Sequence, residues 1–236
     1  MSTDPKFIRH IFEDVAQRYD AMNDVISFGL QRYWKQNLVD RIPVAPNLHL
    51  LDLACGTGDI GYRYAKQNKG LTPTITFCDP SHNMLDKAQD LKIDKNIKGN
   101  FKWIHGEAEA LPFQDNTFDV CVVAFGVRNF SDIPKGLSEI HRVLKPGGCF
   151  LCLEFSQITP QFQSLYQAYL KDIVPHIGQF ITENKAAYDY LADSILHFPD
   201  ADTFQNMLEQ RSFTSVIYSQ FTKGIVALHK GWKHDH

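Results

Sequence analysis

An apolar run with one acid inside it leads into a glycine-rich turn, and this stretch carries the clearest chemistry in the sequence. Residues 50–54 form the run, with Asp52 inside it, and residues 55–59 read Cys-Gly-Thr-Gly-Asp. The pattern predicts a buried strand, a tight turn and a helix, which is the arrangement that holds nucleotide-type cofactors. Gly56 and Gly58 are needed because a Cβ there would keep the ligand away from the backbone.

The charges around this turn indicate which cofactor fits. Asp52 and Asp59 lie on either side of the glycines, the turn contains neither lysine nor arginine, and the Gly-Lys-Ser/Thr of a P-loop is absent. Two acids disfavour a pyrophosphate and attract a ligand with an ammonium and a sulfonium, such as S-adenosylmethionine. Residues 74–78 form a second strand-like run, and the Asp79 that follows is the acid expected to bind a ribose diol. The alternative is an ordinary strand–turn–helix with surface acids.

Dinucleotides and nucleic acids are the two other ligand classes to compare with this sequence. Gly56, Gly58 and Gly61 fit the GxGxxG pattern of a nicotinamide dehydrogenase. The flanking acids argue against that class because they disfavour its pyrophosphate. A nucleic-acid enzyme would need a basic face, whereas the formal net charge is −3 and lysines and arginines are not clustered. We therefore expect no nucleic-acid partner.

The composition is that of an ordinary globular chain, with 44% hydrophobic and 22% charged residues among 236. We expect one domain over residues 1–236, with neither a secretory signal nor a membrane span. The five cysteines lie in or beside predicted strands, as expected for reduced thiols in the cytoplasm. Cys149 and Cys152 should face opposite sides of a strand, so we predict neither a redox pair nor a metal site.

Strand-like and helix-like patterns alternate along the chain, which predicts an α/β fold with a doubly wound sheet. The predicted strands are residues 50–54, 74–78, 101–105, 120–125 and 149–155, followed by a hairpin of residues 215–221 and 225–229. The predicted helices are residues 7–22 and 30–38, the stretches that begin at Ser81 and at Ser131 or Asp132, and residues 199–209. Residues 1–46 should form a helical cap, 157–198 a helical insert and 230–236 a solvated tail.

Several segments resemble the ubiquinone and menaquinone biosynthesis C-methyltransferases, a family of class I S-adenosylmethionine-dependent methyltransferases. Residues 52–58 look like the cofactor motif of the whole class. The more specific similarities are residues 19–29 with Trp34, 109–113, 125–129, 142–148 with 154–156, 190–195 and 224–229. The resemblance runs from about Tyr19 to His229. It implies a Rossmann-like, mostly parallel sheet with a C-terminal antiparallel hairpin, N-terminal helices and a helical insert.

The resemblance also implies a reaction. It is the S-adenosylmethionine-dependent C-methylation of a polyprenyl benzoquinol or naphthoquinol in respiratory quinone biosynthesis, with demethylmenaquinol or a ubiquinol precursor as acceptor. Because such a substrate lies in the bilayer, we expect a cytoplasmic protein with peripheral contact at the inner face of the membrane. A homodimer or a quinone-biosynthesis complex is the expected assembly. The alternatives are a methyltransferase for another small aromatic or lipid acceptor, and a non-catalytic cofactor-binding subunit.

The resemblance assigns cofactor contacts residue by residue. The residues expected along the methionine end are Asp52, Gly56, Thr57 and Gly58. Asp79 should hold the ribose hydroxyls, and Glu107 and Ala108 match the family positions beside the adenine. The aromatic insert Phe162–Phe198 and the N-terminal helix either wall a channel for the isoprenoid tail of the substrate or only complete the core.

Two residues are candidates for the chemical step. A quinol carbon becomes nucleophilic when the adjacent hydroxyl is deprotonated, so the enzyme must stabilise a phenolate and accept protons. Arg128 follows the fourth strand, at the carboxyl edge where ligands bind, and we predict that it stabilises the phenolate, alone or through water. Its alternative role is a structural salt bridge. Tyr19 is the candidate for a hydrogen bond or proton relay, the alternative being a packed tyrosine.

The chain departs from the family pattern at four positions. Gln31 stands where the family usually has histidine, so a proton relay there is in doubt because glutamine does not titrate near neutral pH. Ala124 replaces a serine and removes a hydroxyl that could contact the cofactor. Cys55 stands in place of a glycine. Glu107 replaces an asparagine and loses an amide donor near the expected adenine.

Overall fold

The computed structural model describes residue 24 and residues 27–158, 161, 163–173 and 185–234. The helix predicted over residues 7–22 and the catalytic candidate Tyr19 lie outside the described residues. Within the described part of the chain, none of the helices has the length and apolar character needed to cross a membrane.

One seven-stranded sheet with the order β3-β2-β1-β4-β5-β7-β6 organises the described residues. The strands are β1 (His49–Leu53), β2 (Thr74–Asp79), β3 (Asn100–His105), β4 (Phe118–Ala124), β5 (Leu144–Phe155), β6 (Phe213–Phe221) and β7 (Val226–Lys233). Strands β1 to β5 pair in parallel, and β7 lies antiparallel between β5 and β6. The predicted mostly parallel sheet with a C-terminal hairpin is confirmed. The order reverses between β1 and β4, which is where sheets of this type bind ligands.

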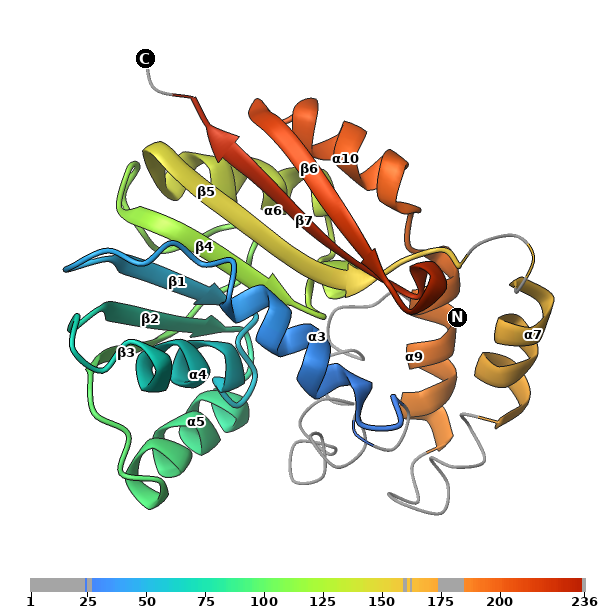
Figure 1. Cartoon of the computed structure of the whole chain (residues 1–236), viewed down its shortest axis with the longest axis horizontal. Coiled ribbons are helices and arrows are strands. Elements are labelled where there is room, and N and C mark those ends of the chain that lie inside the picture. The colour runs from blue at the N-terminus through green and yellow to red at the C-terminus, as the bar shows by residue number, and fades with distance from the viewer. Residues whose placement is uncertain (1–23, 25–26, 159–160, 162, 174–184, 235–236) are drawn as a thin grey trace.

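Helices cover both faces of this sheet (Figure 1). The helices and helical turns are α3 (Leu30–Val39), α4 (Asp59–Gln67), α5 (His82–Asp94), η1 (Val127–Asn129), α6 (Ile133–Val143), α7 (Gln163–Ala168), η3 (Tyr169–Ile173), α9 (Lys185–His197), α10 (Ala201–Glu209) and η4 (Thr222–Gly224). Side chains of α3, α4 and α5 pack in one buried cluster, and those of α6 and α10 pack in another. Strands β1, β2, β4 and β5 contribute alternate residues to the two clusters and are therefore apolar on both faces, whereas the edge strand β3 contributes only to the first cluster.

Within the described part of the chain, helices α3, α7 and α9 lie beyond the carboxyl ends of the parallel strands (Figure 1). Helix α3 falls in the predicted cap of residues 1–46, and α7 and α9 fall in the predicted insert of residues 157–198. Whether these segments form distinct parts of a single domain stays a prediction. Their place above the sheet edge brings them close to the functional site.

The expectation of a solvated tail from residue 230 is wrong for its first residues. Strand β7 continues to Lys233, and Trp232 pairs with Cys149 of β5. The Lys233 ammonium donates to the backbone oxygens of His141 and Leu144 at 3.0 and 2.9 Å. Sheet pairing and these bonds therefore order residues that look like a polar tail in the sequence.

Cys149 and Cys152 lie on opposite sides of β5, as predicted. Cys149 packs in the cluster of α3, α4 and α5, whereas Cys152 packs in the cluster of α6 and α10, so the two thiols face opposite sides of the sheet. All five cysteines are free, and burial raises the pKa of each thiol. Among the described residues, no group of three His, Cys, Asp or Glu side chains is arranged to hold a metal ion.

Candidate functional site

The predicted glycine turn forms one wall of a cavity at the carboxyl edge of β1, β2 and β4. Gly56 and Gly58 have φ of 53° and 80°, in the left-handed region that favours glycine. A Cβ on Gly58 would also lie 2.8 Å from the Tyr62 ring and 3.1 Å from Phe77. Cys55 has no positive φ, so this departure from the family's glycine does not strain the turn.

Asp79 lines the same cavity at the end of β2. Its two carboxylate oxygens accept hydrogen bonds from Gly56 N–H at 2.8 Å and from Ser81 N–H at 2.9 Å. The side chain thus ties the glycine turn to the start of α5, where Ser81 is the N-cap, as predicted. A carboxylate has about four lone-pair positions, so acceptor capacity remains for two hydroxyl donors. This geometry suits the predicted ribose contact.

Asp52 lies deeper, on β1, and is only 1% exposed. It lines the cavity, and its Oδ2 accepts a hydrogen bond from Gly61 N–H at 2.9 Å. Burial is the main cause that raises the pKa of Asp52 to about 8, and the Asp59 and Asp79 carboxylates act in the same direction. A cation bound in the cavity would favour its ionised form.

This burial predicts a pH-dependent stability. Because the folded pKa of Asp52 lies above its ordinary value of 3.8, the folded protein binds a proton that the unfolded chain has released between about pH 4 and 8. Stability contributed by this group therefore falls as the pH rises through that window. Asp52→Asn cannot titrate and should raise the melting temperature at pH 8 more than at pH 5, measured without cofactor.

An exposed acid on α5 provides the control for this experiment. Asp86→Asn should shift the melting temperature alike at both pH values, because that side chain lies in solvent. Melting curves of Asp52→Asn that stay parallel to the wild type from pH 5 to pH 8 would contradict the assigned titration.

Asp59 is paired with two cations, so it is not the unpaired acid that the residues of the turn alone suggest. Lys35 of α3 approaches its Oδ2 at 3.1 Å, and Arg63 approaches its Oδ1 at 2.8 Å. Burial would raise the pKa of Asp59, but the two cations hold it below its usual range. Lys35 also lines the cavity, so a cation is present that the turn itself lacks.

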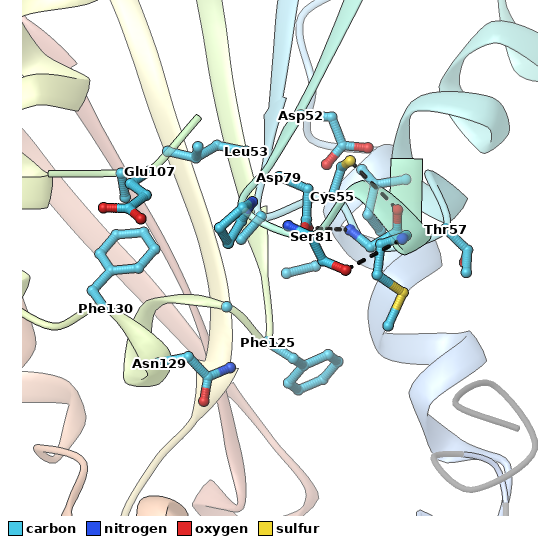
Figure 2. Close-up of a pocket in the computed structure, with 18 of the residues that line it drawn as sticks. Asp52, Leu53, Cys55, Thr57, Asp79, Ser81, Glu107, Phe125, Asn129 and Phe130 are labelled. Atoms are coloured by element: carbon cyan, nitrogen blue, oxygen red, sulfur yellow. Dashed lines mark hydrogen bonds between the residues drawn. The ribbon is translucent and has the colours of Figure 1, made fainter. Parts of the chain in front are cut away.

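The opposite side of the cavity holds the residues expected at the adenine. Glu107 and Ala108 line the wall, as do Ala124 at the end of β4 and Phe130. Figure 2 shows Glu107 and Phe130 on one side, and Asp52, Asp79 and Thr57 on the other. The cavity therefore brings together six of the seven predicted cofactor residues, and the exception is Gly58, where a Cβ would meet the Tyr62 and Phe77 rings.

Asn129 and Phe130 also line the cavity, although neither is among the predicted site residues. Phe130 presents its ring to the cavity, and Asn129 lines it while its Oδ1 accepts a hydrogen bond from the Tyr190 hydroxyl of α9 at 3.0 Å. Asn129 belongs to the segment of residues 125–129 that resembles the family, and this resemblance is the feature of the sequence that points to a role for Asn129 in the site. Phe130 directly follows that segment.

Arg128 lies beside this cavity rather than in its wall. Its Nη1 donates to Glu154 Oε1 at 2.9 Å and to the Phe125 backbone oxygen, while its backbone N–H donates to Glu154 Oε2 at 3.2 Å. The two side chains are 3% and 2% exposed. Arg128 is not one of the described residues that line either cavity. Its guanidinium lies over the Phe155 ring. The predicted contact with a phenolate stays a prediction.

A second cavity, of about 550 Å³, adjoins the first, and Phe125 lines both. Its walls come mainly from α3, α7, η3 and α9 and are largely apolar. The lining includes Trp34, Phe155, Tyr166, Tyr169, Leu191 and Ile195. Gln31 also faces this cavity, and its Nε2 donates to Asp24 Oδ1 at 2.8 Å. Hence the position that differs from the family's histidine lies in the wall of the apolar cavity.

Comparisons with known proteins agree with this geometry. The model of the ubiE/COQ5 methyltransferase family matches residues 1–233. The chain belongs to this family. The ubiquinone/menaquinone biosynthesis C-methyltransferase UbiE of Rickettsia akari is 45% identical over 229 residues, which are 96% of this chain and 92% of the relative.

Solved structures show the same fold at low sequence identity. A Haloferax volcanii methyltransferase, solved with the Trm112 methyltransferase activator, superposes with a TM-score of 0.70 at 17% identity and covers 97% of this chain and 98% of its own. A S-adenosylmethionine-dependent methyltransferase of Thermotoga maritima gives a TM-score of 0.68 at 16% identity, over 96% and 99% of the two chains. The predicted fold class is confirmed.

S-adenosylmethionine is the cofactor of this family member, as predicted. The residues present fit it. Asp79 offers acceptors for a diol, the left-handed glycine turn lets a ligand approach the backbone, and the buried Asp52 offers a carboxylate to a cation. The Phe130 ring on the other side of the cavity (Figure 2) and the apolar Ala108 in the cavity wall suit a flat ring. When bound, the cofactor supplies an electrophilic methyl group on a sulfonium.

Proposed function

We propose that this protein methylates a ring carbon of a polyprenyl quinol, a benzoquinol or a naphthoquinol, in respiratory quinone biosynthesis. The observation that carries the proposal is the pair of adjoining cavities, one lined by acids and the other by apolar side chains, with Phe125 in the wall of both. Family membership and the Rickettsia akari relative, named for ubiquinone/menaquinone biosynthesis, support the reaction class.

The second cavity supports the substrate class. Its volume of about 550 Å³ lies in the range of small-molecule sites, and its wall is mostly aromatic and aliphatic. An isoprenoid tail would replace water against Leu191, Ile195 and Tyr169 and gain the free energy of apolar burial. The quinol ring would then lie at the Phe125 end, next to the cofactor cavity.

The reaction needs a phenolate, a methyl donor and a proton acceptor. The ring carbon beside the phenolate forms a bond to the methyl group, the bond from methyl to sulfur breaks with its electrons on sulfur, and the ring carbon releases its proton as aromaticity returns. We assign Arg128 to stabilising the phenolate, directly or through water, from its place beside Phe125. Tyr19 keeps its proposed part in hydrogen bonding or proton relay, although it lies outside the described residues.

Peripheral contact with a lipid surface is part of the proposal. Phe28 and Leu30 line the second cavity and are 78% and 40% exposed, so apolar side chains flank the cavity on the protein surface. A tail that enters from a bilayer would reach the cavity past these residues without a membrane-spanning helix.

The decisive experiment offers the purified protein both acceptors. Demethylmenaquinol and a ubiquinol precursor, kept reduced in lipid vesicles with S-adenosylmethionine, should gain one methyl group on a ring carbon, measured by mass spectrometry. The same quinones left oxidised are the control and should remain unchanged, because they lack the phenolate.

Other outcomes favour the alternatives. Methylation of a different phenol or lipid with both quinols untouched would indicate another acceptor. Cofactor binding without product for any acceptor would instead favour a non-catalytic cofactor-binding subunit and contradict the proposal.

A further inference from the structure

Lys35 is a buried cation that the reaction described above does not use. It lies on α3, is 7% exposed and lines the cofactor cavity. The described residues that line this cavity include five acids, namely Asp52, Asp59, Asp79, Glu107 and Glu109, and Lys35 is the one lysine or arginine among them. A lysine is almost never buried this deeply unless its charge is paired.

The buried face of α3 positions the Lys35 ammonium at the cofactor cavity. Gln31, Trp34 and Lys35 lie at helical positions i, i+3 and i+4, so they share the buried face of α3. Gln31 and Trp34 line the apolar cavity, whereas Lys35 reaches the glycine turn and pairs with Asp59. One helix face thus contributes to both cavities.

The methionine end of the cofactor carries two opposite charges. Its ammonium matches the carboxylates in the wall, but its carboxylate would meet unfavourable charge from those acids unless a cation accompanies them. Lys35 has three N–H donors, and Asp59 Oδ2 accepts from this ammonium at 3.1 Å. The remaining donors suit a carboxylate at the turn.

We propose that the Lys35 ammonium binds the carboxylate of the methionine end of S-adenosylmethionine and of S-adenosylhomocysteine. This role makes α3 part of the cofactor site. The assignment requires only the cofactor, so it holds whichever acceptor the protein methylates.

The test measures binding of two ligands that differ only in this carboxylate. The ligands are S-adenosylhomocysteine and its decarboxylated analogue, 5′-deoxy-5′-(3-aminopropylthio)adenosine, and their affinities are measured by isothermal titration. Lys35→Met should weaken S-adenosylhomocysteine by about 10- to 100-fold, the size expected for a charge-assisted hydrogen bond. It should change the affinity of the analogue by less than about twofold.

Arg63→Met is the matched control. Arg63 is the other cation on Asp59, at 2.8 Å, and it does not line the cavity, so its loss should affect both ligands alike. Thermal unfolding without ligand checks that each variant folds, and Lys35→Gln replaces Lys35→Met if the latter does not.

Three results would overturn the proposal. In the first, the Lys35 variant binds S-adenosylhomocysteine as tightly as the wild type. In the second, it loses both ligands equally, which indicates that Lys35 only supports Asp59. In the third, Arg63→Met reproduces the ligand-selective loss.

Discussion

Arg128→Met should lower turnover by about 10²- to 10³-fold, the loss expected when an oxyanion loses its stabilising donor. It should also lower the free energy of unfolding by about 3–5 kcal/mol, because Glu154 would remain buried without its cation. Arg128 and Glu154 are 3% and 2% exposed and lie 2.9 Å apart. S-adenosylhomocysteine should still bind, since Arg128 does not line the cofactor cavity. Steady-state kinetics, denaturant unfolding and calorimetry measure the three quantities.

A double variant separates catalysis from charge balance. In Arg128→Met with Glu154→Gln the buried charge is gone, while the amide oxygen can still accept from the Phe155 N–H, which donates to Glu154 Oε1 at 2.9 Å. Stability should recover in part, because the amide has one oxygen where the carboxylate accepted from the N–H groups of both Phe155 and Arg128. Turnover should stay low if Arg128 stabilises the phenolate. Recovered turnover would instead show that Arg128 only neutralises Glu154, the structural role that the sequence left open.

The parts of the site that are local in the chain could be predicted. The glycine turn and Asp79 each follow an apolar strand, and parallel strands place their carboxyl ends at one edge. The cap role of Ser81 and the opposite faces of Cys149 and Cys152 also follow from local geometry. These features depend on neighbours within a few residues, which a sequence displays directly.

Contacts between distant segments could not be predicted in the same way. Lys35 is distant from the turn in sequence, so the charges within the turn do not reveal this cation, which pairs with Asp59 together with Arg63. Glu154 lies on β5, and only the packing of β4 beside β5 reveals that it holds Arg128. In the sequence, Lys233 looks like part of a polar tail. Its carbonyl acceptors lie in α6 and β5, which are distant along the chain, so the sequence does not reveal these hydrogen bonds.

Asp79→Ala should weaken the binding of S-adenosylhomocysteine by more than about 100-fold. Two losses add together. The ribose hydroxyls lose a buried acceptor, and the N–H groups of Gly56 and Ser81 lose the Asp79 carboxylate oxygens to which they donate at 2.8 and 2.9 Å. The second effect loosens the glycine turn itself. Isothermal titration of the folded variant measures the loss, and an affinity equal to the wild type would remove Asp79 from the ribose site.

A ligand that lacks one hydroxyl separates these two effects. Wild-type protein should bind the 2′-deoxy analogue of S-adenosylhomocysteine about tenfold less tightly than the parent, because one hydrogen bond to a carboxylate is lost. Asp79→Asn keeps an oxygen for one of the two backbone donors but has no charge, so it should discriminate less between the two ligands. If Asp79 only shapes the turn, the ratio of the affinities for the parent ligand and its 2′-deoxy analogue should be the same in wild type and variant. The 2′-hydroxyl would then form no hydrogen bond with the Asp79 carboxylate.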